Sequence, residues 1–342
     1  MKKLLIAASL LAFTSTAVQA EQKTLYVGAY GGSTEKLFKE NIIPQWEKQS
    51  GAKVVYVPGN STDTLAKLRA QASSQELDVA FIDDGPMAQA IGFGYCDTVK
   101  EDTFGSLYNA ARMPEGKAVG VGIIATGISY NTKMFADKGW DAPTSWKDLA
   151  DPKYKGLLAV PPITNGYGLH ALIATAMVNG GGVDNIEPGF KQFEDVIAKN
   201  VLVFEPSSGK MSELFQNGEI AISVWGSGRL KALADSGFSG GFAYPKEGGV
   251  KLLVAACPVV DSDVPELAQD FLKFVTSPAT QKLFAVKQGW APVNKSVELT
   301  AEESRALPTG AGIVDNLINI DYKVVNAARG DWTKQWTRRI EN

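Results

Sequence analysis

The chain has 342 residues, 45% of them hydrophobic, and a formal net charge of −3 at pH 7. This length exceeds what one hydrophobic core usually supports, so two lobes are expected. A mildly acidic chain without long charged runs argues against nucleic acid and anionic membrane surfaces as partners.

The first 20 residues have the pattern of a secretory signal peptide. Lys2 and Lys3 precede an apolar run over residues 4–13, and small residues follow up to Ala20. The apolar run is too short to span a bilayer. We therefore expect cleavage after Ala20 and a periplasmic mature protein.

The scarcity of cysteine and histidine excludes several kinds of chemistry. Cys96 and Cys257 are expected to be two buried thiols, with a disulfide between them as the alternative that export permits. His170 is predicted to be a packed or capping residue of an apolar helix. There is no metal-ligand cluster, no nucleophile elbow and no phosphate loop, so neither a metal nor a cofactor is expected.

Strands and helices alternate from residue 24 onward. Strands are predicted at 24–29, 53–57 and 78–82. A helix with a break at Pro44 follows the first strand, and Ser61 or Thr62 is expected to cap the next helix. This alternation predicts an α/β fold with a doubly wound parallel sheet.

Two long apolar segments, 120–130 and 251–260, are predicted to cross between lobes. The segments between them predict a second α/β unit, with strands at 155–160, 202–204 and 219–225. Helices are expected to begin at Pro265 and Pro278. The expected division is 1–20 signal peptide, 21–125 first part of lobe 1, 126–252 lobe 2, and 253–342 return to lobe 1 with C-terminal helices.

In doubly wound sheets, ligands bind beyond the carboxyl ends of the strands. Two first-lobe loops lie there in the prediction, and their candidate ligand-binding residues are Tyr30, Gly31, Asp83 and Asp84. The acidic pair could accept an ammonium group or, alternatively, cap the following helix. Tyr30 could contact a ligand or simply pack.

The second lobe offers another set of candidates at predicted strand ends and helix starts. Small residues beside Ser227 and Asn165 leave backbone N–H groups exposed, which favours an anion. A structural turn explains the glycines beside Asn165 nearly as well, and Arg229 could instead be a solvated surface residue. Arg229 lies at a helix start, where a nearby carboxylate would offset the helix dipole. Trp225 and Tyr167 complete the set, Trp225 as a ligand wall or a core residue.

Several motifs, in their order and spacing, resemble periplasmic solute-binding proteins of ABC importers, of the spermidine/putrescine-binding type. They are Gly51-Ala52-Lys53-Val54-Val55-Tyr56, Thr144-Ser145-Trp146-Lys147-Asp148-Leu149, Pro152-Lys153-Tyr154-Lys155-Gly156, Val224-Trp225-Gly226-Ser227-Gly228, Pro245-Lys246-Glu247-Gly248-Gly249, and Gln281 to Asn294. The resemblance implies a two-lobe periplasmic-binding-protein fold of type II, joined by crossing strands. It also implies a monomer that closes on a solute without catalysis and delivers it to an inner-membrane permease. Trp225 matches a ligand-stacking tryptophan of that family.

The sequence departs from the polyamine-binding pattern. Where those proteins carry a tryptophan and an aspartate, this chain has Leu252 and Val254. Fewer acids together with Arg229 favour a solute bearing a carboxylate, such as an amino acid, with a polyamine as the alternative. No neighbouring tyrosine pair supports ferric iron.

Two other functions remain open at this stage. An exported hydrolase or lyase would need a carboxylate pair such as Asp83 and Asp84. A chemoreceptor partner would share the binding step with a transport protein.

Overall fold

The structure is a computed structural model that describes residues 23–341 apart from 305, 306, 310 and 315. The predicted signal peptide and its cleavage site therefore lie outside the described residues. Within the described part of the chain, no helix is both long and apolar enough to cross a bilayer.

One mixed sheet runs through the whole molecule, in the order β2-β1-β3-β9-β4-β7-β5-β6, with β8 pairing to β4. Its strands are β1 (Thr24–Ala29), β2 (Lys53–Pro58), β3 (Val79–Asp83), β4 (Val119–Asn131), β5 (Leu158–Val160), β6 (Val201–Phe204), β7 (Ile222–Gly226), β8 (Gly240–Ala243) and β9 (Val250–Pro258).

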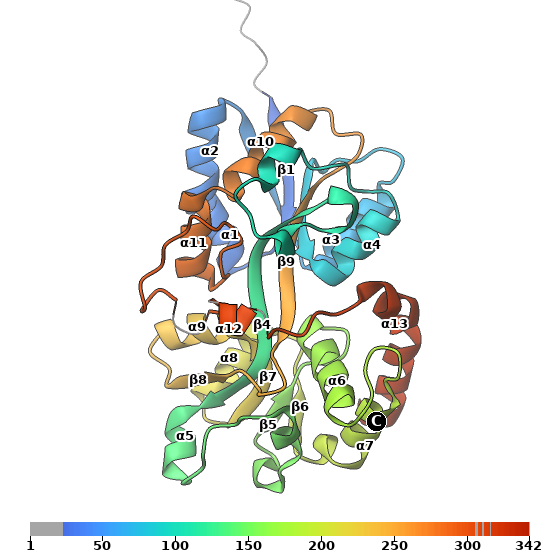
Figure 1. Cartoon of the computed structure of the whole chain (residues 1–342), viewed down its shortest axis with the longest axis vertical. Helices are drawn as coiled ribbons and strands as arrows, with labels where there is room; N and C mark the ends of the chain where they lie inside the picture. The colour runs from blue at the N-terminus through green and yellow to red at the C-terminus, as the bar shows by residue number, and fades with distance from the viewer. Residues whose placement is uncertain (1–22, 305–306, 310, 315, 342) are drawn as a thin grey trace, which may run out of the picture.

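Strands β4 and β9 join the two lobes, as the sequence predicts (Figure 1). They pair antiparallel from Val119↔Ala256 to Thr126↔Val250. At one end β9 pairs with β3, and at the other end β4 pairs with β7 and β8. The two strands are therefore shared by both lobes.

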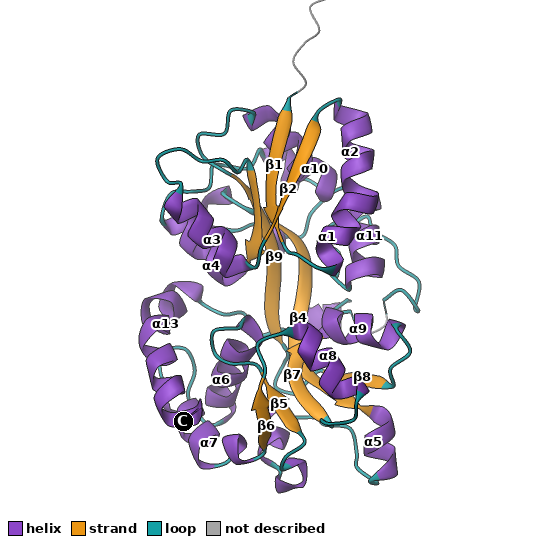
Figure 2. Ribbon diagram, turned by 180° about the vertical axis from the view of Figure 1, so that it is seen from behind, coloured by secondary structure: helices purple, strands orange, loops and turns teal. Residues whose placement is uncertain are grey.

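Helices flank the strands of each lobe on both sides (Figure 2). They are α1 (Ser33–Leu37), α2 (Ile43–Ser50), α3 (Ser61–Ala70), α4 (Asp84–Gly92), α5 (Thr132–Asp137), α6 (Gly166–Val178), α7 (Glu187–Asp195), α8 (Ser208–Gln216), α9 (Ser227–Asp235), α10 (Pro265–Val275), α11 (Pro278–Gln288), α12 (Ala311–Val314) and α13 (Tyr322–Trp336). The predicted α/β class with two doubly wound lobes is confirmed.

Local signals at helix ends were interpreted with mixed success. The break expected at Pro44 is a π-helical turn over Phe38–Ile42, immediately before α2. The N-cap of α3 is Asn60, whose side chain accepts hydrogen bonds from the backbone of Thr62 and Asp63, so the predicted caps at Ser61 and Thr62 are wrong. An asparagine oxygen can reach both amides from the N-cap position.

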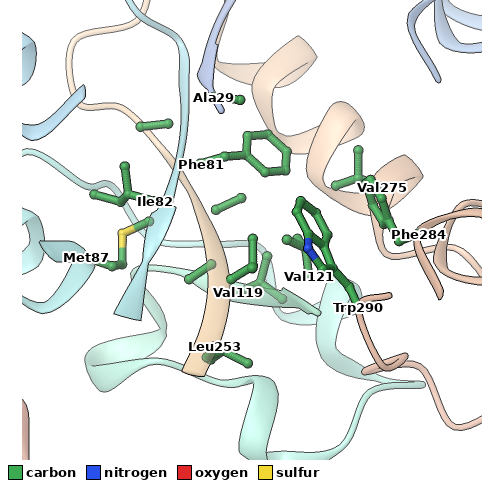
Figure 3. Packing of buried hydrophobic residues seen from close by; sticks show 14 of the residues in the cluster. Ala29, Phe81, Ile82, Met87, Val119, Val121, Leu253, Val275, Phe284 and Trp290 are labelled. Atoms are coloured by element: carbon green, nitrogen blue, oxygen red, sulfur yellow. The ribbon is translucent and has the colours of Figure 1, made fainter. Parts of the chain in front are cut away.

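The first-lobe core packs aromatic side chains from distant segments together. Phe81 of β3 and Phe284 of α11 both contact Phe38, and Phe284 also contacts Trp290 with ring centroids 4.9 Å apart. Figure 3 shows the Trp290 indole beside Val121 of the crossing strand β4. Trp290 thereby lies where the first lobe meets the hinge strands.

The C-terminal helix α13 packs on the second lobe. Its residues Val325, Trp332 and Trp336 are buried in the cluster that contains Phe190 and Phe193 of α7. The domain prediction placed residues 253–342 in a return to lobe 1 with C-terminal helices, without assigning those helices to a lobe.

Cys96 and Cys257 form a disulfide, with Cα atoms 5.6 Å apart. The preferred expectation of two buried thiols is therefore wrong. Cys257 lies on β9, which pairs with β3, and the chain returns from α4 to place Cys96 beside β9 through the bridge to Val259. Such proximity depends on strand order, which cysteine spacing does not reveal.

Candidate functional site

A cleft of about 530 Å³ lies between the lobes. Its walls include the first turns of α3 and α4 from the first lobe, and of α6, α8 and α9 from the second. Helix N-termini carry partial positive charge and free N–H groups, so their convergence favours an anionic group in the cleft.

Asp83 provides the acidic group of the first-lobe wall. It ends β3, and its Oδ1 accepts a hydrogen bond of 2.6 Å from the Tyr30 hydroxyl. Burial raises the pKa of Asp83, while the hydrogen bonds from Tyr30 and Ser61 and the charges of Arg229 and Arg329 oppose that rise. A carboxylate can accept more than these two hydrogen bonds, so Asp83 can still bind a cation.

Asp84 lies next to Asp83 but has different partners. Its Oδ2 accepts from the backbone N–H of Leu253 at 3.0 Å, and its Oδ1 from that of Gly85 at 3.1 Å. Tyr322 also hydrogen-bonds to this carboxylate, and burial raises the pKa of Asp84 to about 7. Asp84 therefore holds α4 against β9 and contacts the cleft as a structural group.

Two guanidinium groups face Asp83 from the second lobe. Arg229 comes from the first turn of α9 and Arg329 from α13, and both line the cleft. Among the residues that the structure describes, no carboxylate lies within 4.0 Å of either guanidinium group. Arg329 donates to the Thr164 carbonyl at 3.2 Å, and burial lowers its pKa.

Asn165 and Tyr167 form the start of α6 at the same wall. The Asn165 side chain accepts a hydrogen bond from the Tyr167 backbone at 2.9 Å, so Asn165 is the helix N-cap. Burial raises the pKa of Tyr167, whose hydroxyl hydrogen-bonds to Arg229. Tyr167 thus orients one of the two cations toward the cleft.

The structure brings six of the nine predicted site residues together around the cleft. They are Tyr30, Asp83, Asp84, Asn165, Tyr167 and Arg229. Gly31, Trp225 and Ser227 do not line it. These six residues lie at the strand ends and helix starts that the sequence analysis had used to select them.

Trp225 is a core residue rather than the expected ligand wall. It is 1% exposed and stacks on Phe215 with ring centroids 6.0 Å apart. Ser227 is also buried, and its Oγ accepts from the Ala125 backbone at 3.2 Å, which ties α9 to the crossing strand. Gly31 is exposed and lies apart from the cleft lining.

The glycines around Ser227 serve close packing rather than the predicted anion contact. A Cβ at Gly226 would lie 2.4 Å from the Tyr167 hydroxyl oxygen. A Cβ at Gly228 would lie 2.7 Å from the carbonyl oxygen of Gly289, which belongs to the first lobe. Glycine is required there because the two lobes touch backbone to backbone.

The lining residues that the sequence analysis missed include Trp290, Tyr322 and Arg329. Trp290 precedes Ala291, which pairs with Ile123 of β4, so it lies at the hinge. The signal that could have found the other two is their spacing: Tyr322 and Arg329 are seven residues apart, on one face of a helix. Leu252 and Val254 contribute apolar lining, at the two positions where the polyamine-binding pattern has a tryptophan and an aspartate.

Among the described residues, no group of three or more His, Cys, Asp or Glu side chains could hold a metal ion. The lone histidine is buried with its Nδ1 2.7 Å from Thr126 Oγ1 and its Nε2 2.8 Å from the Tyr322 hydroxyl. Burial lowers the pKa of His170 to about 3, so it is neutral.

The family model for bacterial extracellular solute-binding proteins matches residues 41–309. The chain belongs to this family. It is 23% identical over 336 residues to the gamma-aminobutyric acid-binding protein of Pseudomonas aeruginosa, with 91% of each chain covered.

Solved structures share the whole architecture. An ABC transporter protein from Clostridium perfringens has a TM-score of 0.78 and 25% identity, covering 92% of this chain and 99% of that one. The Atu4243–GABA receptor has a TM-score of 0.77 and 19% identity, covering 92% and 96%. The predicted two-lobe periplasmic-binding-protein fold and the function of an ABC-transporter solute-binding protein are confirmed. The family and these neighbours are substrate-binding proteins rather than enzymes.

Proposed function

We propose that this protein captures a small zwitterionic amino acid, with separated ammonium and carboxylate groups, between its lobes. Hinge closure about β4 and β9 would enclose the solute, which then passes unchanged to an inner-membrane permease. The observation that carries the proposal is the charge distribution in the cleft, with Asp83 on one wall and Arg229 and Arg329 on the other.

The charges call for a ligand that has both signs. Arg229 is exposed and Arg329 partly buried, and neither guanidinium group has a carboxylate within ion-pair distance in the described part of the chain. Closure of the lobes would bury both groups, and a buried charge without a partner is costly. A ligand carboxylate between them would compensate both. Asp83 would pair with the ammonium group at the other end.

A polyamine fits these walls poorly. Its ammonium groups would face two guanidinium groups, and Leu252 and Val254 add no negative charge. We propose that the motifs shared with spermidine/putrescine-binding proteins reflect a common scaffold rather than a common ligand. The similarity to two gamma-aminobutyrate-binding proteins supports the zwitterion.

The cleft size and the apolar lining suit a small solute. Ligand cavities span roughly 300–1,000 Å³, and this one measures about 530 Å³. Trp290, Leu252 and Val254 would pack against the methylene groups between the charged ends.

Catalysis by the acidic pair is the less favoured alternative, because Asp84 is already engaged by Leu253, Gly85 and Tyr322. A general acid or base needs a free position at the reacting group. Recovery of an incubated solute unchanged, judged by mass spectrometry, would support binding without turnover.

A thermal-shift panel tests the proposed ligand class. It contains 4-aminobutyrate, α-amino acids, dicarboxylates, putrescine and spermidine, each far above micromolar concentration. A solute at a hundredfold excess over its Kd stabilises the folded protein by about 2.7 kcal/mol. Stabilisation by an amino acid but not by a polyamine supports the proposal, and the reverse pattern overturns it.

Export and oligomeric state belong to the same proposal. We expect the mature chain to begin at residue 21, because the small residues up to Ala20 form a cleavage site. We also expect a monomer. Intact mass of periplasmic protein and light scattering after size exclusion measure the two.

A further inference from the structure

A chain of buried hydrogen bonds runs from the crossing strand β4 to the start of α4. Thr126 Oγ1 lies 2.7 Å from His170 Nδ1, and His170 Nε2 lies 2.8 Å from the Tyr322 hydroxyl. Tyr322 in turn hydrogen-bonds to the Asp84 carboxylate. These hydrogen bonds therefore link β4, α6, α13 and α4, and their last two members, Tyr322 and Asp84, line the cleft.

Each hydrogen bond in this series has a defined donor and acceptor, and the donors all lie on the Thr126 side of their acceptors. The Asp84 carboxylate accepts from Leu253 and Gly85, so the Tyr322 hydroxyl donates to it. Tyr322 then accepts from Nε2–H of the neutral His170, whose Nδ1 accepts from Thr126. Every member is satisfied, which is the condition for a stable buried polar network.

This chain of hydrogen bonds passes from the second lobe to the first. His170 lies in α6, and α13 is held in the second lobe by Val325, Trp332 and Trp336. Asp84 begins α4 of the first lobe. Figure 1 shows α13 alongside the second lobe with one end close to α4.

Asn326 and Gly85 make a second contact across the same boundary. The Asn326 amide nitrogen donates to the Gly85 carbonyl at 3.1 Å, and Gln89 donates to the Asn326 amide oxygen at 3.1 Å. A Cβ at Gly85 would lie 2.8 Å from a carbon of the Tyr322 ring. The ring thus packs directly on the backbone of α4.

The same face of α13 also carries Arg329. Tyr322, Asn326 and Arg329 follow the i, i+4, i+7 spacing that places residues along one helix face. Contact of this face with α4 therefore coincides with entry of the Arg329 guanidinium group into the cleft.

We propose that Tyr322 is a positioning residue that locks the lobes together, bridging His170 of the second lobe to Asp84 of the first only when the cleft is closed. The inference rests on the proposed capture by hinge closure. Although Tyr322 and Asp84 both line the cleft, their contact joins the two lobes to each other, and it slows the release of an enclosed solute.

Spin labels report the lobe separation without any solute. We place them at Lys39→Cys in the first lobe and Lys210→Cys in the second, both exposed positions, and measure distances by pulsed electron resonance. Tyr322→Phe should shift the distribution to longer distances in the absence of solute. Tyr26→Phe, which alters an exposed first-lobe tyrosine, is the matched control.

Gly85→Ala provides a second variant acting on the same contact. It should lengthen the distances as Tyr322→Phe does, while Gly92→Ala in the same helix, with open space around it, should not. Because both active variants break one contact, the double variant should open no further than the more open single one. Additive opening, or an unchanged distribution in Tyr322→Phe, would overturn the lock.

Kinetics with 4-aminobutyrate as the probe separate this inference from the proposed function. Tyr322→Phe should raise the dissociation rate constant about tenfold and change the association rate constant less than twofold, since solute enters the open form, in which Tyr322 and Asp84 are apart. A wild-type protein that does not bind 4-aminobutyrate contradicts that choice of solute, whereas the distance measurement still decides the lock. An equal loss in both rate constants contradicts the lock.

Discussion

The two walls of the cleft are built by different means. The first-lobe wall holds its acidic group with protein hydrogen bonds, from Tyr30 and Ser61 to Asp83. The second-lobe wall presents Arg229 and Arg329, which lack ion-pair partners in the part of the chain described. In the proposed function, the first wall is complete before binding, whereas a solute anion would complete the second.

Removal of a guanidinium group tests the incomplete wall most directly. Arg329→Ala should weaken binding of 4-aminobutyrate by about 3 kcal/mol or more, because a buried charge pair loses one partner. Isothermal titration measures the change. Arg338→Ala, an exposed arginine at the end of the chain, serves as control and should leave the Kd unchanged. If Arg329→Ala binds 4-aminobutyrate as tightly as the wild type does, the solute carboxylate does not bind at Arg329.

A substitution of Asp83 in the first-lobe wall should reduce affinity less than Arg329→Ala does, and it should change which solutes bind. Asp83→Asn should weaken 4-aminobutyrate by about 2 kcal/mol, since a charged hydrogen bond becomes neutral. It should at the same time improve binding of a dicarboxylate such as succinate, because repulsion is removed. Asp102→Asn, an exposed first-lobe position, is the control. Weakening of both solutes would contradict the assignment of Asp83 to the ammonium end.

The contact between α9 and the first lobe tests whether both walls must meet. Gly228→Ala introduces a Cβ 2.7 Å from the Gly289 carbonyl oxygen, so the lobes cannot approach as closely. We expect about tenfold weaker binding, or about 1.4 kcal/mol, with the unfolding temperature of the solute-free protein unchanged. Gly330→Ala has open space around it and should bind normally.

The smallest expected effect is a pH dependence of the free energy of unfolding that comes from Asp84. Burial raises the pKa of Asp84 from 3.8 to about 7, so the folded protein binds a proton more tightly than the unfolded chain. Its contribution to stability is therefore full below about pH 4 and is lost as pH rises to 7. The slope is at most about 1.4 kcal/mol per pH unit.

Comparison with Asp84→Asn isolates this contribution. His170 acts in the opposite direction, because its lowered pKa removes stability as pH falls from 6.5 toward 3. The difference in unfolding free energy between wild type and Asp84→Asn should decline from pH 4.5 to 7, as measured by urea titration. A difference that rises over this interval would contradict the raised pKa of Asp84.

Sequence patterns were sufficient for the scaffold. Alternation of strands and helices and two long apolar crossings led to the two-lobe α/β fold, and β1 begins and ends at the predicted residues. The candidate residues at strand ends and helix starts, such as Asp83 and Arg229, line the cleft because that geometry is local. Family motifs supported the solute-binding function.

These sequence patterns did not predict how distant segments of the chain pack against one another. Trp225 and Trp290 both follow apolar or helical segments, yet the first packs on Phe215 and the second lines the cleft. The disulfide depends on β9 lying beside β3, and Arg329 reaches the site because α13 returns to the second lobe.

The sequence by itself determined the order of elements, the two lobes and the charges at their strand ends, since each follows from spacing along the chain. Only the tertiary structure decided which aromatic ring faces the cleft, whether the two cysteines pair and how Tyr322 contacts both lobes. Those outcomes depend on contacts between residues far apart in sequence, and such contacts produce no periodic pattern in the amino-acid sequence.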